Sequence, residues 1–288
     1  MKPVVAVIAP GMMGAGIGAR LVERGLTVLT SLAGRSEASV QRASSAGMTP
    51  ASEAEIASAD FLLSIVPPGE ALPLAKRLAG VLQASNHKPL YVDCNAISPQ
   101  SARRVGEVIA KAGCPFVDAG IIGGPPRAGR EGPSIYVCGA DAAAVETLNS
   151  YGLLIRRMKG GLGDASALKM SYGGLTKGLT ALGSALILAA TKAGVAADLH
   201  EELARSQPAI LTYLQRGVPD MFAKAYRWVA EMEEVAHFVG SEAERDMYEA
   251  IADFYERLAE DQAGSKEEVN TLGDFFSSPA AGNGGPKA

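Results

Sequence analysis

The stretch that decides the fold is residues 4–14, which read Val4-Val5-Ala6-Val7-Ile8-Ala9-Pro10-Gly11-Met12-Met13-Gly14. Its first five residues form a continuous apolar run, which predicts a strand buried on both faces. Helical periodicity follows over 15–24. A glycine turn between a first strand and a first helix lets the backbone approach a pyrophosphate, and the helix start offers free amides. We therefore predict a dinucleotide site made by Pro10, Gly11, Met12, Met13 and Gly14. Ala9 replaces the usual first glycine, so a tight turn that binds nothing is the alternative.

Outward from this turn, short apolar runs alternate with helical patterns through the first half of the chain. The predicted strands are 27–30, 61–66, 90–93, 115–119 and 134–139. Continuous apolar strands separated by helices are typical of a parallel sheet covered on both faces. The fold class predicted is α/β, with an N-terminal Rossmann-type doubly wound sheet.

The second half of the chain shows helical patterns and no convincing strand. Asp164 can begin a long helix that ends near Gly194. Further helices are predicted over 196–206, 208–215, 219–239 and 241–262, and a flexible tail over 277–285. We therefore predict two domains: a dinucleotide-binding domain over residues 1–163, and an all-α domain over residues 164–288, which we expect to serve substrate binding and dimerisation.

The composition excludes several classes of partner. The 288 residues are 48% hydrophobic and 20% charged, with a formal charge of -4, which offers no basic surface for nucleic acid or acidic lipid. No apolar run approaches the length of a membrane span, about 20 residues. The three scattered cysteines, Cys94, Cys114 and Cys138, lack metal-ligand spacing and indicate reduced thiols in the cytoplasm. The sequence predicts no metal site.

Nucleotide choice depends on the residues after the second strand. An acidic residue there would bind the ribose of NAD, whereas a basic residue would accept the 2′-phosphate of NADP. The first acid is Glu37, and before it stand Ser31, Arg35 and Ser36. An arginine fork with neighbouring hydroxyls favours NADP over NAD. A solvated loop arginine is the alternative for Arg35.

Four segments together resemble the β-hydroxyacid dehydrogenase family, which includes 3-hydroxyisobutyrate and 6-phosphogluconate dehydrogenases. They are the loop 10–14, the strand end 64–68, the stretch 118–125 with Ala128 and Gly132, and the segment 161–169. The resemblance covers residues 1 to about 190. The stretch 93–99 and the helical region around 226–232 resemble a less characterised subgroup of 6-phosphogluconate-dehydrogenase-like proteins.

The resemblance implies roles for several residues. Lys169 would be the general acid/base, one turn into a helix that would aim it into a cleft between the domains; a surface lysine is the alternative. Val66 and Pro67 would lie beside the ribose and nicotinamide of the cofactor. Asn95, at a strand end, could bind the ribose or the substrate, or cap the next helix.

The same resemblance predicts a substrate site with two departures from the family. Gly123 and Gly124 would offer backbone amides to a substrate carboxylate, unless they only form a turn. Ile122 stands where the family has a serine, and Gly173 where it has an asparagine. Tyr172 or Ser171 could replace one of the lost polar groups, so the substrate need not be a familiar hydroxyacid.

The predicted function is NADP-dependent hydride transfer between nicotinamide and a small, carboxylate-bearing hydroxyacid or related carbonyl compound. An imine-type reductase and an NADP-binding sensor without catalysis are the alternatives. The apolar helix over 175–190 predicts a homodimer packed through the helical half.

Overall fold

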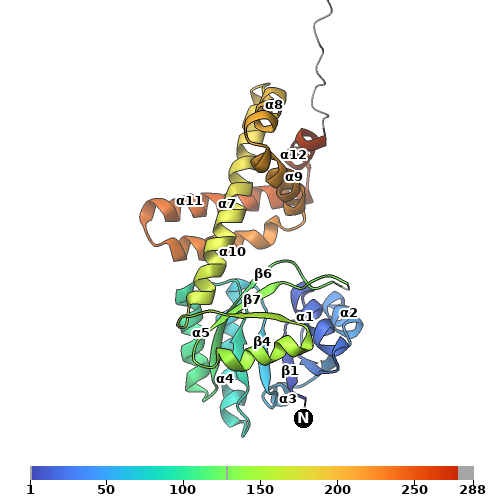
Figure 1. Cartoon of the computed structure of the whole chain (residues 1–288), viewed down its shortest axis with the longest axis vertical. Coiled ribbons are helices and arrows are strands. Elements are labelled where there is room, and N and C mark those ends of the chain that lie inside the picture. Colours follow the sequence, from blue (N-terminus) through green and yellow to red (C-terminus); the bar gives the residue numbers. More distant parts are fainter. Residues whose placement is uncertain (1, 128, 278–288) are drawn as a thin grey trace, which may run out of the picture. The chain divides into compact units, whose positions relative to one another are not determined.

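The computed structural model describes residues 2–127 and 129–277 (Figure 1). Ala128 and the predicted tail beyond Ser277 lie outside the described residues. The chain divides into two compact units, Met1–Ser171 and Tyr172–Ala288, with the division inside one long helix.

The first unit contains an eight-stranded sheet of order β3-β2-β1-β4-β5-β6-β7-β8. All neighbouring strands pair parallel except β6 and β7, which are antiparallel. This arrangement confirms the predicted doubly wound class. The strands are β1 Val4–Ile8, β2 Thr27–Thr30, β3 Thr49–Pro50, β4 Phe61–Ser64, β5 Leu90–Asp93, β6 Phe116–Ile122, β7 Ser134–Cys138 and β8 Leu154–Arg157.

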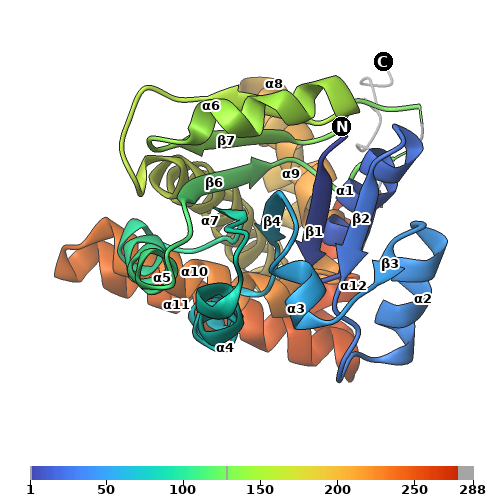
Figure 2. The ribbon, with the colours of Figure 1, turned by 90° about the horizontal axis from the view of Figure 1, so that it is seen from below.

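Helices cover both faces of this sheet because the strand residues are apolar on both sides. The helices and 3-10 turns of this part are α1 Met12–Glu23, α2 Glu37–Ser45, α3 Glu53–Ile56, η1 Pro68–Glu70, α4 Ala71–Ala84, α5 Pro99–Lys111, α6 Ala142–Val145 and η2 Glu146–Tyr151. On one face Ile17 and Leu21 of α1 pack with Val5 and Val7. On the other face buried residues of α3, α4 and α5 form one core cluster with residues of β1, β4 and β5. Figure 2 shows α4 and α5 on this side of the sheet, seen from below. The helices cover the two faces of the sheet, so the carboxyl ends of the parallel strands are bordered by loops.

The remaining helices are α7 Asp164–Lys192, α8 Ala196–Ser206, α9 Pro208–Phe222, α10 Ala225–Val239, α11 Glu242–Ala263 and α12 Glu267–Ser277. The predicted all-α class of this half is confirmed. The predicted boundary at Pro219 is wrong, since α9 continues through Pro219 to Phe222. Val218 and Met221 are buried on this last turn, and their packing offsets the helix-breaking effect of the proline.

The second unit is held together by hydrogen bonds to backbone carbonyls of α7. The Tyr213 hydroxyl donates to the Thr176 carbonyl at 2.6 Å, and the Tyr255 hydroxyl donates to the Lys177 carbonyl at 2.6 Å. The Lys177 ammonium also pairs with Glu231 at 2.6 Å, with both side chains largely buried. These contacts fix α9, α10 and α11 against one helix.

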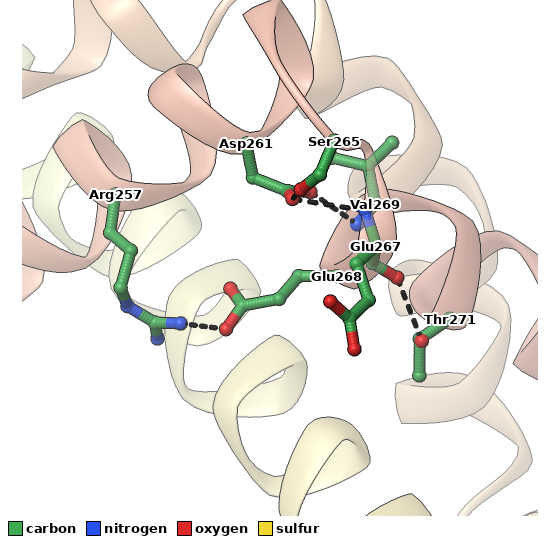
Figure 3. Close-up of polar contacts among 7 residues, drawn as sticks. All are labelled: Arg257, Asp261, Ser265, Glu267, Glu268, Val269 and Thr271. Atoms are coloured by element: carbon green, nitrogen blue, oxygen red, sulfur yellow. Dashed lines mark hydrogen bonds and ion pairs between the residues drawn. The ribbon is translucent and has the colours of Figure 1, made fainter.

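The last helix, α12, is capped by Asp261 of α11 (Figure 3). Its carboxylate accepts hydrogen bonds from the backbone N–H groups of Glu267 and Val269, each at 2.9 Å, and from the Ser265 hydroxyl at 2.8 Å. A carboxylate at a helix start satisfies amides that have no partner within the helix. This cap explains a helix that the sequence periodicity did not predict.

One helix of the described part, α7, is long and apolar enough to cross a membrane by length and composition. A core helix of a soluble protein passes the same test, so this property is weak evidence for a membrane span.

Candidate functional site

The glycine loop connects β1 to α1 as the sequence predicts. Gly11 is the N-cap of α1 in extended conformation, and no side chain caps the helix start. A Cβ at Gly14 would collide with the Ala9 carbonyl oxygen, whereas a Cβ at Gly11 would meet no atom within 4 Å. Gly14 therefore permits the tight turn, and Gly11 leaves open space over the amide end of the helix.

The predicted 2′-phosphate residues lie between β2 and α2. Ser31 is buried, Arg35 is half-buried, and Ser36 is the exposed N-cap of α2. The Ser36 hydroxyl lies 3.2 Å from the Ser39 hydroxyl. The structure thus places a short row of polar groups at the start of α2.

A second arginine, Arg42, lies in this region and was not predicted from the sequence. The Nη2 of Arg42 donates to the Ser39 hydroxyl at 2.8 Å, and its Nε donates to the Pro10 carbonyl at 3.1 Å. The available signal was the three-residue spacing of Ser36, Ser39 and Arg42, which places them on one side of a helix. The link to Pro10 is tertiary and has no sequence pattern.

Asn95 joins the ends of β4 and β5. Its side-chain oxygen accepts the Val66 N–H at 2.7 Å, and its amide nitrogen donates to the Ser64 hydroxyl at 2.9 Å. Only 2% of Asn95 is exposed. The amide is therefore used inside the protein to hold Val66 and the following Pro67, and its direct contact with ribose or substrate stays a prediction.

Two buried carboxyl groups lie next to each other in the sheet, because Asp93, the last residue of β5, pairs in register with Asp118 inside β6. Burial raises the pKa of Asp93 to about 7, opposed by the hydrogen bond from the Asn95 backbone and reinforced by Asp118. Asp93 Oδ2 is buried without a hydrogen-bond partner in the described part of the chain. Burial, with the nearby Asp118, also raises the pKa of Cys138 to about 12. Burial therefore favours the neutral forms of the Asp93 carboxyl and the Cys138 thiol.

Asp118 anchors the start of α7. Its Oδ2 accepts the backbone N–H groups of Gly163 and Ser166 at 3.0 Å each, and its Oδ1 accepts the Ser166 hydroxyl at 2.6 Å. Asp118 is 1% exposed, so these bonds form away from water. The strand β6 thereby sets the position of the helix that carries Lys169.

Lys169 is half-buried on α7 and faces β6 across Gly120. A Cβ at Gly120 would lie 3.1 Å from the Lys169 Cβ and 2.7 Å from the Ala165 carbonyl oxygen. Only glycine permits this approach of helix and strand. Tyr172, predicted to bind substrate, is 50% exposed and is the first residue of the second unit.

The predicted substrate glycines follow β6. Gly123 has φ +126°, which favours glycine, and a Cβ there would meet Pro133 at 3.1 Å. A Cβ at Gly124 would meet nothing within 4 Å, so its backbone is open to a ligand.

The loop after Gly124 rests on α1. Arg20 of α1 donates to the carbonyl oxygens of Arg127 and Arg130 at 3.1 and 3.0 Å. A Cβ at Gly16 would come within 2.9 Å of Pro126. The structure therefore brings the predicted substrate stretch against the helix that begins at the predicted pyrophosphate loop.

A cavity of about 430 Å³ lies in the second unit, among α7, α11 and α12. It is lined by Ala185, Leu188, Ala189, Thr191, Lys192, Arg257, Glu267, Glu268 and Thr271. It contains no residue predicted for cofactor, substrate or catalysis. Across residues 2–127 and 129–277, no group of three or more His, Cys, Asp or Glu side chains could hold a metal ion.

The chain is similar to several known proteins over most of its length. A conserved protein of unknown function, described as structurally similar to 3-hydroxyacid dehydrogenases, is 31% identical, with a TM-score of 0.69 over 93% of this chain and 99% of that chain. The 3-hydroxyisobutyrate dehydrogenase of Mycobacterium tuberculosis, solved with L-serine, is 21% identical, with a TM-score of 0.70 over 94% and 99%.

An imine reductase from Myxococcus stipitatus, solved with NADP+, shares the fold at 18% identity, with a TM-score of 0.54 over 96% of this chain and 100% of that chain. Residues 190–258 match a domain family of unknown function. Residues 4–151 match the model of the NAD binding domain of 6-phosphogluconate dehydrogenase. With that match over half of the sequence, and with the glycine loop and Rossmann-type sheet that carry it, the chain belongs to the 6-phosphogluconate and 3-hydroxyacid dehydrogenase family, in a less characterised subgroup.

Proposed function

We propose that the protein is an NADP-dependent oxidoreductase that transfers a hydride between nicotinamide and a small carboxylate-bearing hydroxyacid or related carbonyl compound. The observation that carries the proposal is the seating of Lys169 on β6 through Gly120, with α7 fixed by Asp118. A lysine has a defined position when its helix lies this close to a strand glycine and is anchored by a buried carboxylate, and acid/base catalysis requires a defined position.

The residues at the end of β1 fit a dinucleotide. The open space over Gly11 and the uncapped start of α1 suit a pyrophosphate. Val66 and Pro67, held by Asn95, would line the ribose and nicotinamide side. NADP is proposed over NAD because Ser31, Arg35 and Ser36 precede the first acid after β2.

When bound, the nicotinamide would supply the hydride to a carbonyl carbon or accept it from an alcohol. In the direction of reduction, the Lys169 ammonium would donate a proton to the carbonyl oxygen; in the reverse direction, the amine would take the hydroxyl proton. The backbone amides of Gly123 and Gly124 would bind the substrate carboxylate, and Tyr172 would supply a polar contact. This division of roles accounts for one hydride and one proton per turnover.

We also propose a cytoplasmic homodimer that packs through α7. Leu175, Leu182 and Leu186 are 71%, 59% and 57% exposed in the single chain. Their spacing places them on one side of the helix, and a second copy presenting the same row would cover them.

The test is absorbance at 340 nm during incubation with NADPH and a panel of oxoacids and aldehydes, and with NADP+ and hydroxyacids. Turnover of a carboxylate-bearing carbonyl compound is expected. Activity with cyclic imines and not with carbonyls would point to an imine reductase. Tight NADPH binding without turnover of any compound would point to a sensor.

A further inference from the structure

Arg42 connects the two loops that a dinucleotide would contact. It lies on α2, and its guanidinium reaches back to the Pro10 carbonyl of the glycine loop while also holding the Ser39 hydroxyl. The first contact is 3.1 Å and the second is 2.8 Å. The side chain is half-buried and is held by these two bonds.

The charge of this guanidinium has no counter-ion within the described residues. Both of its acceptors, a carbonyl and a hydroxyl, are neutral, and Nη1 forms no hydrogen bond in the described part of the chain. A half-buried cation with free donors beside a nucleotide loop is suited to an anion, because a guanidinium fork matches phosphate geometry.

Two hydroxyls extend the donor set. Ser39 contacts Arg42 directly, and the Ser36 hydroxyl lies 3.2 Å from that of Ser39. Serine hydroxyls can donate to phosphate oxygens. Arg42, Ser39 and Ser36 thus form a continuous row from the glycine loop to the end of the β2–α2 loop.

We propose that Arg42, with Ser36 and Ser39, binds the 2′-phosphate of NADP and so determines the preference for NADP over NAD. The inference rests on the proposed function and deepens it, since it names a specificity-determining residue beyond Arg35. The competing group is Glu37, an exposed acid in the first turn of α2 that would instead favour the free ribose hydroxyl of NAD.

The experiment measures Kd by isothermal titration for NADPH and NADH, and for the fragments 2′,5′-ADP and 5′-AMP. The proteins are the wild type, Arg42→Ala, Arg42→Lys and Ser39→Ala. The matched control is Arg104→Ala, which removes an exposed arginine of α5. Thermal melting of each variant verifies that it folds.

Arg42→Ala is expected to raise the Kd for NADPH and for 2′,5′-ADP by about tenfold or more, because charge-assisted bonds to the phosphate are lost. The Kd for NADH and for 5′-AMP should be nearly unchanged. Arg42→Lys should retain part of the preference, Ser39→Ala should lose a smaller part, and Arg104→Ala should match the wild type.

Equal weakening of NADPH and NADH in Arg42→Ala would overturn the proposal, because Arg42 would then only support the glycine loop through Pro10. A wild type that binds both nucleotides equally, or prefers NADH, would overturn it while leaving the dehydrogenase function in place. A wild type that binds neither would remove the proposed function itself.

Discussion

Gly120 of β6 lies directly against Lys169 of α7, so closely that an added Cβ would approach the Lys169 Cβ to 3.1 Å. The same Cβ would approach the Ala165 carbonyl oxygen to 2.7 Å. This oxygen belongs to the backbone of α7, so it can move away only if the helix moves. The absence of a side chain at one strand residue therefore sets the distance between the sheet and the proposed catalytic lysine.

Gly120→Ala is expected to displace α7 and to lower the free energy of unfolding by about 1–3 kcal/mol, the usual cost of overpacking. Activity should fall further than stability accounts for, because Lys169 moves with the helix. Urea unfolding and kcat/KM measure the two effects. The control is Gly80→Ala in α4, where a Cβ meets nothing and alanine should stabilise the helix by about 0.5–1 kcal/mol. A Gly120→Ala protein with wild-type stability and kcat would refute the close approach.

Asp118→Ala should be strongly destabilising because it leaves the buried N–H groups of Gly163 and Ser166 without acceptors. The expected loss is about 1–3 kcal/mol for each unsatisfied group. Asp118→Asn keeps one oxygen for both amides and should cost much less, since the Ser166 hydroxyl can rotate to accept from the new amide. Denaturant unfolding of both variants tests this order, and equal losses would contradict it.

Asp93 makes stability depend on pH. Its pKa is raised by burial from the ordinary value of 3.8 to about 7 in the folded protein. Its stabilising contribution is therefore fully present below about pH 4 and is lost as pH rises to about 7, at about 1.4 kcal/mol per pH unit. Asp93→Asn should reduce the downward slope of stability between these values, relative to wild type and to the exposed control Asp141→Asn. If the free energy of unfolding changed with pH at the same rate in all three proteins, the pKa of Asp93 would not be raised in the folded protein.

Lys169→Met should lower kcat by about 10²-fold or more, as expected for loss of a general acid/base, with little change in the Kd for NADPH. Lys192→Met, at the exposed end of the same helix, is the control. Stopped-flow absorbance separates the chemical step from binding. Unchanged turnover in Lys169→Met would remove the lysine from the mechanism.

Leu182→Glu should convert the proposed dimer into a monomer, because it places a charge in the middle of the exposed row on α7. Light scattering during size-exclusion chromatography measures the mass. Val40→Glu, on α2 in the other unit, should remain dimeric. A monomeric mass for the wild type would rule out the dimer.

Local patterns in the sequence were sufficient for much of the fold. The apolar run Val4–Ile8 and the following glycines predicted the first strand and turn, because strand burial and close backbone approach depend on residue type alone. The helix from Asp164 was predicted to end near Gly194 and ends at Lys192, since its many Ala and Leu residues have high helix propensity. The roles that the family motifs imply for Lys169 and for the glycine pair at 123–124 stay predictions.

Long-range contacts decided what the sequence could not. The helix α9 continues through Pro219 because packing of its last turn outweighs the local preference, and α12 depends on a cap from Asp261 of the preceding helix. The engagement of Asn95 with Val66 and the reach of Arg42 to Pro10 join residues 29 and 32 positions apart. Such pairings have no period in the sequence, because they are set by which strand ends and helices the sheet order brings together.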